Sequence, residues 1–193
     1  MSVNKYLVQS FVNNLLEGSP EDKLFYQNKI IDLLGGDSTP NVNNLPPRRG
    51  RADGGLDGRI PVIAPLIIKH TLPNTLLPNT RGILFEIGNN VLQEAGINIK
   101  IQKQKFSIEQ FGGFKDALER EKLYVGIIIT ALDLSPDVKQ RIYDIQQDKI
   151  YIFAHILLQD LLMGEIKVKG FDFACGDISL QIFSEALKIY RMT

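Results

Sequence analysis

From Ile97 onward the sequence alternates between strand-like and helix-like segments. The stretch INIKIQ places Ile97, Ile99 and Ile101 on one side of an extended segment and polar residues on the other, which is the two-residue period of a strand. A helix start at Ser107, the apolar run YVGIIIT, a helix start at Ser135 and the run KIYIFA follow in that order. This alternation predicts an α/β fold with a central mixed or parallel sheet flanked by helices.

The rest of the chain is assigned from the same patterns. Helical spacing of apolar residues predicts further helices at residues 3–16, 20–34, 81–95, 155–163 and 178–190. The apolar residues between Leu56 and Ile68 predict a strand or bent hairpin, in which Pro61 and Pro65 restrict pairing to an edge or an end. A chain of 193 residues with 44% hydrophobic content predicts one domain over residues 1–193, with N-terminal helices at residues 3–34.

Composition excludes several classes of function. Lys plus Arg and Asp plus Glu both number 22, so no field from the whole molecule attracts nucleic acid or an anionic membrane, and any polyanion site has to be local. Cys175 is the single cysteine, which rules out an internal disulfide and a cysteine-based zinc cluster. The polar-interrupted N-terminus predicts neither a signal peptide nor a membrane span, and hence a cytoplasmic protein. The sequence contains no Walker loop, Rossmann fingerprint or nucleophile elbow.

One set of residues suggests chemistry. The stretch GRADGGLDGRI, residues 50–60, places Asp57 at the entrance of a predicted strand, while Asn98 and Lys100 share one face of another. If the two strands are neighbours, a carboxylate, a second oxygen ligand and an ammonium group meet. Oxygen ligands hold Mg²⁺, and a nearby ammonium orients or helps to deprotonate the water that attacks a phosphodiester. The alternative is that Asp53 and Asp57 are ordinary turn residues.

Three stretches resemble a known family. They are ADGGLDG, INIKIQ and the segment KFSIEQFGGFKDALEREKLYVGIIITALDLSPDV, which includes the run from Gly126 to Thr130. In this order they resemble the Mrr-type restriction endonucleases of the PD-(D/E)XK nuclease superfamily, over about two thirds of the chain. The resemblance implies a restriction-endonuclease-like core and cleavage of DNA in restriction or defence against foreign DNA.

The resemblance also implies roles for particular residues. It makes Asp57, Asn98 and Lys100 the catalytic residues, and it makes Asp57, Asn98 and the carbonyl of Ile99 the ligands of Mg²⁺, for which Mn²⁺ is a possible substitute. It implies DNA as the partner and no membrane. Cutting both strands further implies a homodimer or a partner nuclease subunit.

The sequence departs from the family pattern at two points. Asn98 stands where Gln or Glu is usual, and a neutral side chain binds a metal less strongly than a carboxylate. The segment between the aspartate and the lysine is also longer than in the family, so Lys69 or Lys103 is an alternative to Lys100, and Glu86 could supply the missing carboxylate. A catalytically silent nuclease-like module, which binds DNA or assembles into a larger complex, is therefore the alternative function.

Further residues are candidates for contact with nucleic acid. Arg48, Arg49 and Arg51 form a basic cluster beside the predicted site, and Lys103 follows the Asn-Ile-Lys motif. Phosphate contact is one interpretation. The other is that the arginines serve loop solubility and that Lys103 belongs to a solvated strand edge. His155, in the apolar stretch IFAHILL, is interpreted as a hydrogen-bonded core histidine rather than a general base.

Overall fold

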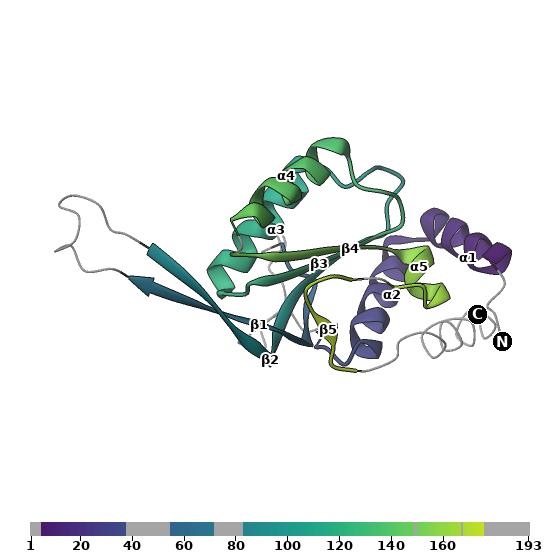
Figure 1. Ribbon diagram of the computed structural model, residues 1–193. Helices are drawn as coiled ribbons and strands as arrows, with labels where there is room; N and C mark the ends of the chain where they lie inside the picture. The colour runs from purple at the N-terminus through teal and green to yellow at the C-terminus, as the bar shows by residue number, and fades with distance from the viewer. Residues whose placement is uncertain (1–4, 38–54, 72–82, 149, 167, 176–193) are drawn as a thin grey trace.

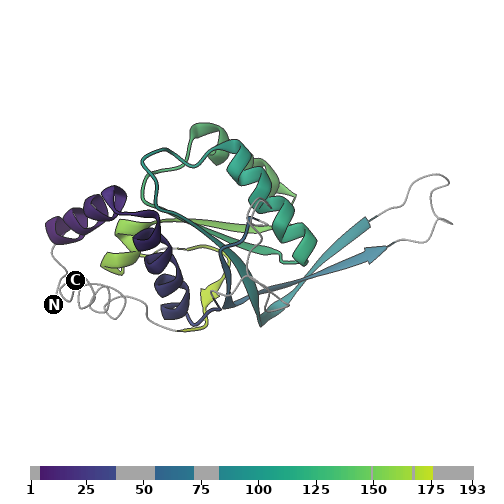
Figure 2. The same cartoon turned by 180° about the vertical axis from the view of Figure 1, so that it is seen from behind.

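The protein is built around one mixed five-stranded sheet with helices on both faces (Figure 1). The computed structural model describes residues 5–37, 55–71, 83–148, 150–166 and 168–175. The strand order is β4-β3-β2-β1-β5. The reverse view shows the two groups of helices on opposite sides of the sheet (Figure 2). The predicted α/β class, with a central mixed sheet flanked by helices, is confirmed.

Two N-terminal helices pack on one face of the sheet. They are α1 (Lys5–Glu17) and α2 (Pro20–Leu33). The hydroxyl of Ser19 caps α2 by accepting a hydrogen bond from the amide of Asp22, whose carboxylate in turn accepts from the amide of Ser19. This reciprocal arrangement satisfies backbone donors at the helix start, as the sequence Ser-Pro-Glu-Asp predicts. No helix in the described part of the chain is long and apolar enough to cross a membrane.

Strands β1 (Gly58–Thr71) and β2 (Ile83–Lys100) form a long antiparallel hairpin that projects from the body of the protein (Figure 1). The helix predicted at residues 81–95 is therefore wrong. Between the pairs Pro65↔Asn90 and Ile67↔Ile87, β2 has one residue more than β1. Leu84, Ile87, Val91 and Leu92 recur at helical spacing, but all four are paired with residues of β1, so long-range pairing overrides the local pattern.

The second half of the sheet is parallel. After β2 the chain forms α3 (Ile108–Glu121), β3 (Val125–Thr130), α4 (Pro136–Gln147), β4 (Ile152–Leu157), α5 (Leu158–Met163) and the short β5 (Asp172–Phe173). Strands β2, β3 and β4 run parallel, with Lys100, Thr130 and Leu157 in register at their carboxyl ends. Serines 107 and 135 cap α3 and α4 as predicted.

The boundary predicted near His155 is wrong. His155 lies inside β4 rather than at the start of a helix, and α5 begins three residues later. Pairing with β3 extends β4, because His155 lies opposite Ile128 in a strand that is buried throughout. Several predicted features lie outside the described residues: the helix predicted at residues 178–190, Asp53 and the three arginines of the basic cluster.

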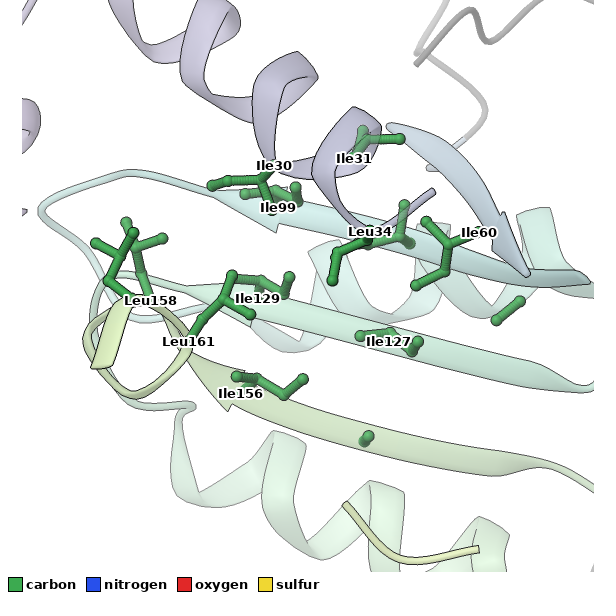
Figure 3. Packing of buried hydrophobic residues seen from close by; sticks show 14 of the residues in the cluster. Ile30, Ile31, Leu34, Ile60, Ile99, Ile127, Ile129, Ile156, Leu158 and Leu161 are labelled. Carbon is green, nitrogen blue, oxygen red and sulfur yellow. The ribbon is translucent and has the colours of Figure 1, made fainter. Parts of the chain in front are cut away.

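The sheet separates two hydrophobic clusters. The larger one joins α1, α2 and α5 to one face and contains Ile99, Ile127 and Ile129 (Figure 3). The smaller one joins α3 and α4 to the other face and contains Phe114 and Ile128. Alternate residues of β3 thus point into different clusters, which explains why the run YVGIIIT is apolar at every position.

Packing of α3 against the sheet requires glycine at Gly126. A Cβ atom there would lie 2.7 Å from Leu118 Cδ1 and 2.8 Å from Phe153 Cε1. We expect Gly126→Ala to lower the free energy of unfolding by about 1–3 kcal/mol, the usual cost of overpacking a core. Urea denaturation measures this change.

Gly112 provides a matched control for that variant. It lies inside α3, and an added Cβ atom would have no neighbour within 4 Å. Gly112→Ala should raise the stability by up to about 1 kcal/mol, because alanine favours a helix interior. Equal effects from the two substitutions would contradict the packing described here.

Candidate functional site

The candidate site lies where the start of β1 meets the end of β2. The amide of Asp57 donates to the carbonyl oxygen of Ile97 at 2.9 Å, and the Asp57 carboxylate accepts from the amide of Ile99 at 2.6 Å. The ammonium of Lys100 lies 3.5 Å from the same carboxylate oxygen. The side chains of Asp57 and Lys100 are 20% and 30% exposed. The structure thus brings the predicted aspartate and lysine together in a half-buried ion pair that solvent can still reach.

The glycines before Asp57 allow this close approach. Gly55 has a φ of +79°, and a Cβ atom there would lie 2.3 Å from the carbonyl oxygen of Gly113 in α3. A larger residue would be unfavourable for two reasons: its backbone would have to adopt a positive φ, and its Cβ atom would clash with α3. The turn containing Gly55 is therefore wedged between α3 and β2, and this position fixes where Asp57 enters β1.

Asn98, which the sequence predicts to be a metal ligand, makes a structural contact. Its side-chain amide donates a 2.7 Å hydrogen bond to the carbonyl oxygen of Gly55 and so fastens the turn to β2. The residue is 3% exposed, and its Oδ1 atom is buried without a hydrogen-bond partner among the described residues. A buried acceptor without a partner costs about 1–3 kcal/mol. This oxygen can therefore accept a hydrogen-bond donor or a cation at low cost.

Gln27 is part of the site and was missed by the sequence analysis. Its amide nitrogen donates a 2.6 Å hydrogen bond to the carbonyl oxygen of Ile99, the backbone group predicted to bind metal. The available signal was its position, because Gln27 precedes the buried Ile30 and Ile31 by three and four residues and so lies on the apolar side of α2. A polar residue on an apolar helix face indicates a specific hydrogen bond in the interior.

The other candidate residues lie elsewhere. Lys103 pairs with Glu17 of α1 at 2.6 Å, and both side chains are exposed. Lys69 is opposite Phe85 in the projecting hairpin, twelve residues along β1 from Asp57, which corresponds to roughly 40 Å of strand. Glu86 lies in the same part of the hairpin and pairs with His70 at 3.0 Å. Among the lysines considered, Lys100 is the one that contacts Asp57.

A second polar group lies along the same edge of the sheet. Thr130, in register with Lys100, lies 2.7 Å from His155 Nε2 through its hydroxyl. The other ring nitrogen lies 3.9 Å from Asp133, whose carboxylate also contacts Lys139. The hydrogen bond from Lys139 holds the pKa of Asp133 below its usual value. Burial lowers the pKa of His155, and the carboxylate of Asp133 opposes that shift only in part.

These contacts define what the site can do chemically. It offers a carboxylate, a buried amide oxygen and a backbone carbonyl, all of them oxygen donors, next to one ammonium group. No group of three His, Cys, Asp or Glu side chains suited to a metal ion occurs in the described ranges. The comparisons with known proteins give no match, whether to a family model, to a curated protein or to a solved structure.

The carboxylate of Asp57 has a structural role that two substitutions can isolate. Asp57→Ala leaves the buried amide of Ile99 without its acceptor, so we expect the free energy of unfolding to fall by about 1–3 kcal/mol. Asp57→Asn keeps an acceptor oxygen at that position and should cost less. Urea denaturation of both variants measures the difference, and equal losses would show that the hydrogen bond does not stabilise the fold.

The lowered pKa of His155 predicts a pH dependence of stability. The unfolded chain takes up a proton at the usual pKa of about 6.5, whereas the folded chain resists it. The free energy of unfolding should therefore fall as the pH drops from about 7.5 to 5. In His155→Gln the urea midpoint, which reports the free energy of unfolding, should fall less over the same pH range. The control is His70→Gln on the exposed hairpin, which should leave the pH dependence of the urea midpoint in place. An unchanged pH dependence in His155→Gln would contradict the role given to His155.

Proposed function

We propose that the protein is a Mg²⁺-dependent DNA endonuclease with a restriction-endonuclease-like core. The observation that carries the proposal is the 3.5 Å approach of Lys100 to the Asp57 carboxylate, beside the backbone of Ile99. These are the positions at which the sequence resembles Mrr-type nucleases. An aspartate at the entrance of one strand and a lysine at the end of the next form a compact site for phosphodiester hydrolysis.

The donor atoms suit a hard cation. Asp57, Asn98 Oδ1 and the carbonyl of Ile99 would hold Mg²⁺ or Mn²⁺, which prefer oxygen ligands. The unpartnered Oδ1 of Asn98 supports this fit, because a cation would satisfy it. The carbonyl of Ile99 would have to share its oxygen with the amide of Gln27. When bound, such an ion polarises a phosphoryl oxygen and lowers the pKa of a coordinated water.

The remaining contacts orient the reacting groups. The amide of Ile99 holds one oxygen of Asp57, which fixes the direction of the carboxylate. The ammonium of Lys100 is a donor and a positive charge that can hold the attacking water or a phosphate oxygen, and the ion pair with Asp57 keeps it in place. Gln27 orients the carbonyl of Ile99 in the same way. Preorganised groups of this kind stabilise charge that develops in the transition state.

DNA would have to be bound by local contacts, because the net charge of the chain is zero. Lys103 remains a candidate for phosphate contact, since its exposed ammonium is held on the surface by Glu17. The basic cluster at residues 48–51 is the other candidate. A role in restriction or defence against foreign DNA belongs to the same proposal and rests on the resemblance alone.

The proposal predicts loss of activity in two variants with a matched control. With Mg²⁺ present, Asp57→Asn and Lys100→Met should each lower the rate of plasmid nicking by about 100-fold or more, the usual effect of removing a catalytic group. Lys103→Met removes a neighbouring ammonium that pairs with Glu17 and should lower the rate far less. Calorimetric titration with Mg²⁺ should show binding that Asp57→Asn abolishes and Lys103→Met retains. Nicking by Asp57→Asn at the wild-type rate would exclude the mechanism.

The second candidate is a nuclease-like module without catalytic activity. The observation that favours it is the hydrogen bond from Asn98 to Gly55, which commits the amide of Asn98 to holding the turn. A wild-type protein that neither binds Mg²⁺ nor nicks DNA, but retains DNA in a gel-shift assay, would support this alternative over the nuclease.

A further inference from the structure

Among the described residues, no strand pairs with one backbone edge of the projecting hairpin. In the described part of the chain, β3 pairs with β2 only from Gly96 onward, and β5 pairs with β1 only at Val62 and Ile63. The outer edge of β2 from Ile83 to Ala95 therefore pairs with no strand in the ranges that the structure describes. Figure 1 shows this part of the hairpin extending away from the helices. A two-stranded hairpin alone is marginally stable in water, and a third strand would stabilise it.

The two strands of the hairpin are protected to different degrees. Strand β1 carries Pro61, Pro65 and Lys69, residue types that discourage pairing at an edge. Strand β2 has no proline or lysine between Ile83 and Ala95, and it exposes four large apolar side chains, Ile83, Leu84, Ile87 and Leu92. Its two charged residues in that range, Glu86 and Glu94, are paired within the chain with His70 and Arg59. The edge of β2 is thus the one suited to pairing.

The direction of the free backbone groups follows from the paired end of β2. The carbonyl of Lys100 accepts from Ala131 beyond β3, whereas the backbone groups of Ile97 and Ile99 face Asp57 on the other side. Because backbone groups alternate along a strand, those of Leu92 face the unpaired edge. Leu92 is also 69% exposed. It therefore offers both a backbone donor and an apolar side chain to a partner.

We propose that the edge of β2 pairs antiparallel with the same edge of a second copy of this chain. The two hairpins then form a four-stranded sheet around a two-fold axis. The outer edges of this sheet belong to β1, whose prolines discourage the addition of further copies, so assembly stops at the dimer. Pairing of exposed edges is an established mode of recognition. The ion pair of Glu94 with Arg59 reduces like-charge repulsion between the copies.

The geometry around the edge accommodates a second strand. A groove lined by Phe85, Tyr124 and Tyr151 separates the hairpin from the ends of α3 and α4 and can receive side chains of the partner. In an antiparallel arrangement the two bodies lie at opposite ends of the shared sheet. The site at Asp57 and Lys100 stays outside the interface, so the proposal is independent of the proposed nuclease activity.

Two variants at one position distinguish edge pairing from apolar contact. Light scattering after size-exclusion chromatography should give the wild-type chain a mass twice its 21.7 kDa. Leu92→Pro removes an outward backbone donor without breaking the ladder to β1, and it should yield a monomer with an unchanged circular dichroism spectrum. Leu92→Thr removes the apolar side chain but keeps the donor, and it should remain a dimer. A monomeric wild type, a dimeric Leu92→Pro or a monomeric Leu92→Thr would each overturn the proposal.

A cysteine scan decides the question even if Leu92→Pro fails to fold. Single cysteines are placed at each position from Leu84 to Leu92 in a Cys175→Ser background, with Lys69→Cys on β1 as the control. A disulfide needs Cα atoms about 4.4–6.8 Å apart, so covalent dimers should form only at one or two neighbouring positions next to the two-fold axis. No crosslink on β2, or equal crosslinking at all positions including Lys69→Cys, would overturn the proposal.

Discussion

The last five residues of β2, from Gly96 to Lys100, are held by contacts on both sides, and the rest of the structure depends on these contacts. On one side they join β3 in a parallel ladder, and on the other they meet the start of β1 and the Asp57 turn. Ile97 and Ile99 are fully buried in the larger core. This segment connects the antiparallel hairpin to the parallel half of the sheet. A change in its register by one residue would move Lys100 to the other face of the sheet and separate it from Asp57.

Much of this arrangement follows from sequence patterns that act locally. Three of these patterns can be recognised without reference to distant residues, and the structure contains all of them. They are the alternation in INIKIQ, the caps at Ser107 and Ser135 and the continuous apolar run of β3. The approach of Asp57 to Lys100 was predictable for the same reason, since it requires only that two strands with clear boundaries be neighbours. The contact of Asn98 with Gly55 likewise requires only that β1 and β2 be neighbours.

The features that sequence analysis missed depend on partners far apart in the chain. The first part of β2 reads as a helix because Leu84, Ile87 and Val91 recur at helical spacing, and only their pairing with β1 shows that the segment is a strand. Gln27 contacts Ile99 across 72 positions, so its role appears only once α2 is packed on the sheet. Pairing with β3, likewise, decides that His155 belongs to a strand. Long-range pairing overrode local preference in each case.

The amide at Asn98 illustrates how the fold constrains the chemistry of the site. Its nitrogen donates to the carbonyl of Gly55, and an ionised carboxylate at the same place cannot donate, so two oxygens would face each other at about hydrogen-bond distance. Glu, one of the two residues usual at this position in the resembling family, would therefore weaken the turn that carries Asp57, unless that turn moved. A neutral side chain with one donor and one acceptor serves both needs: the donor holds Gly55, and the buried Oδ1 remains available to a ligand. The departure from the family pattern thus has a structural reason in this chain, and the carboxylate of Asp57 would have to supply the negative charge that Asn98 lacks.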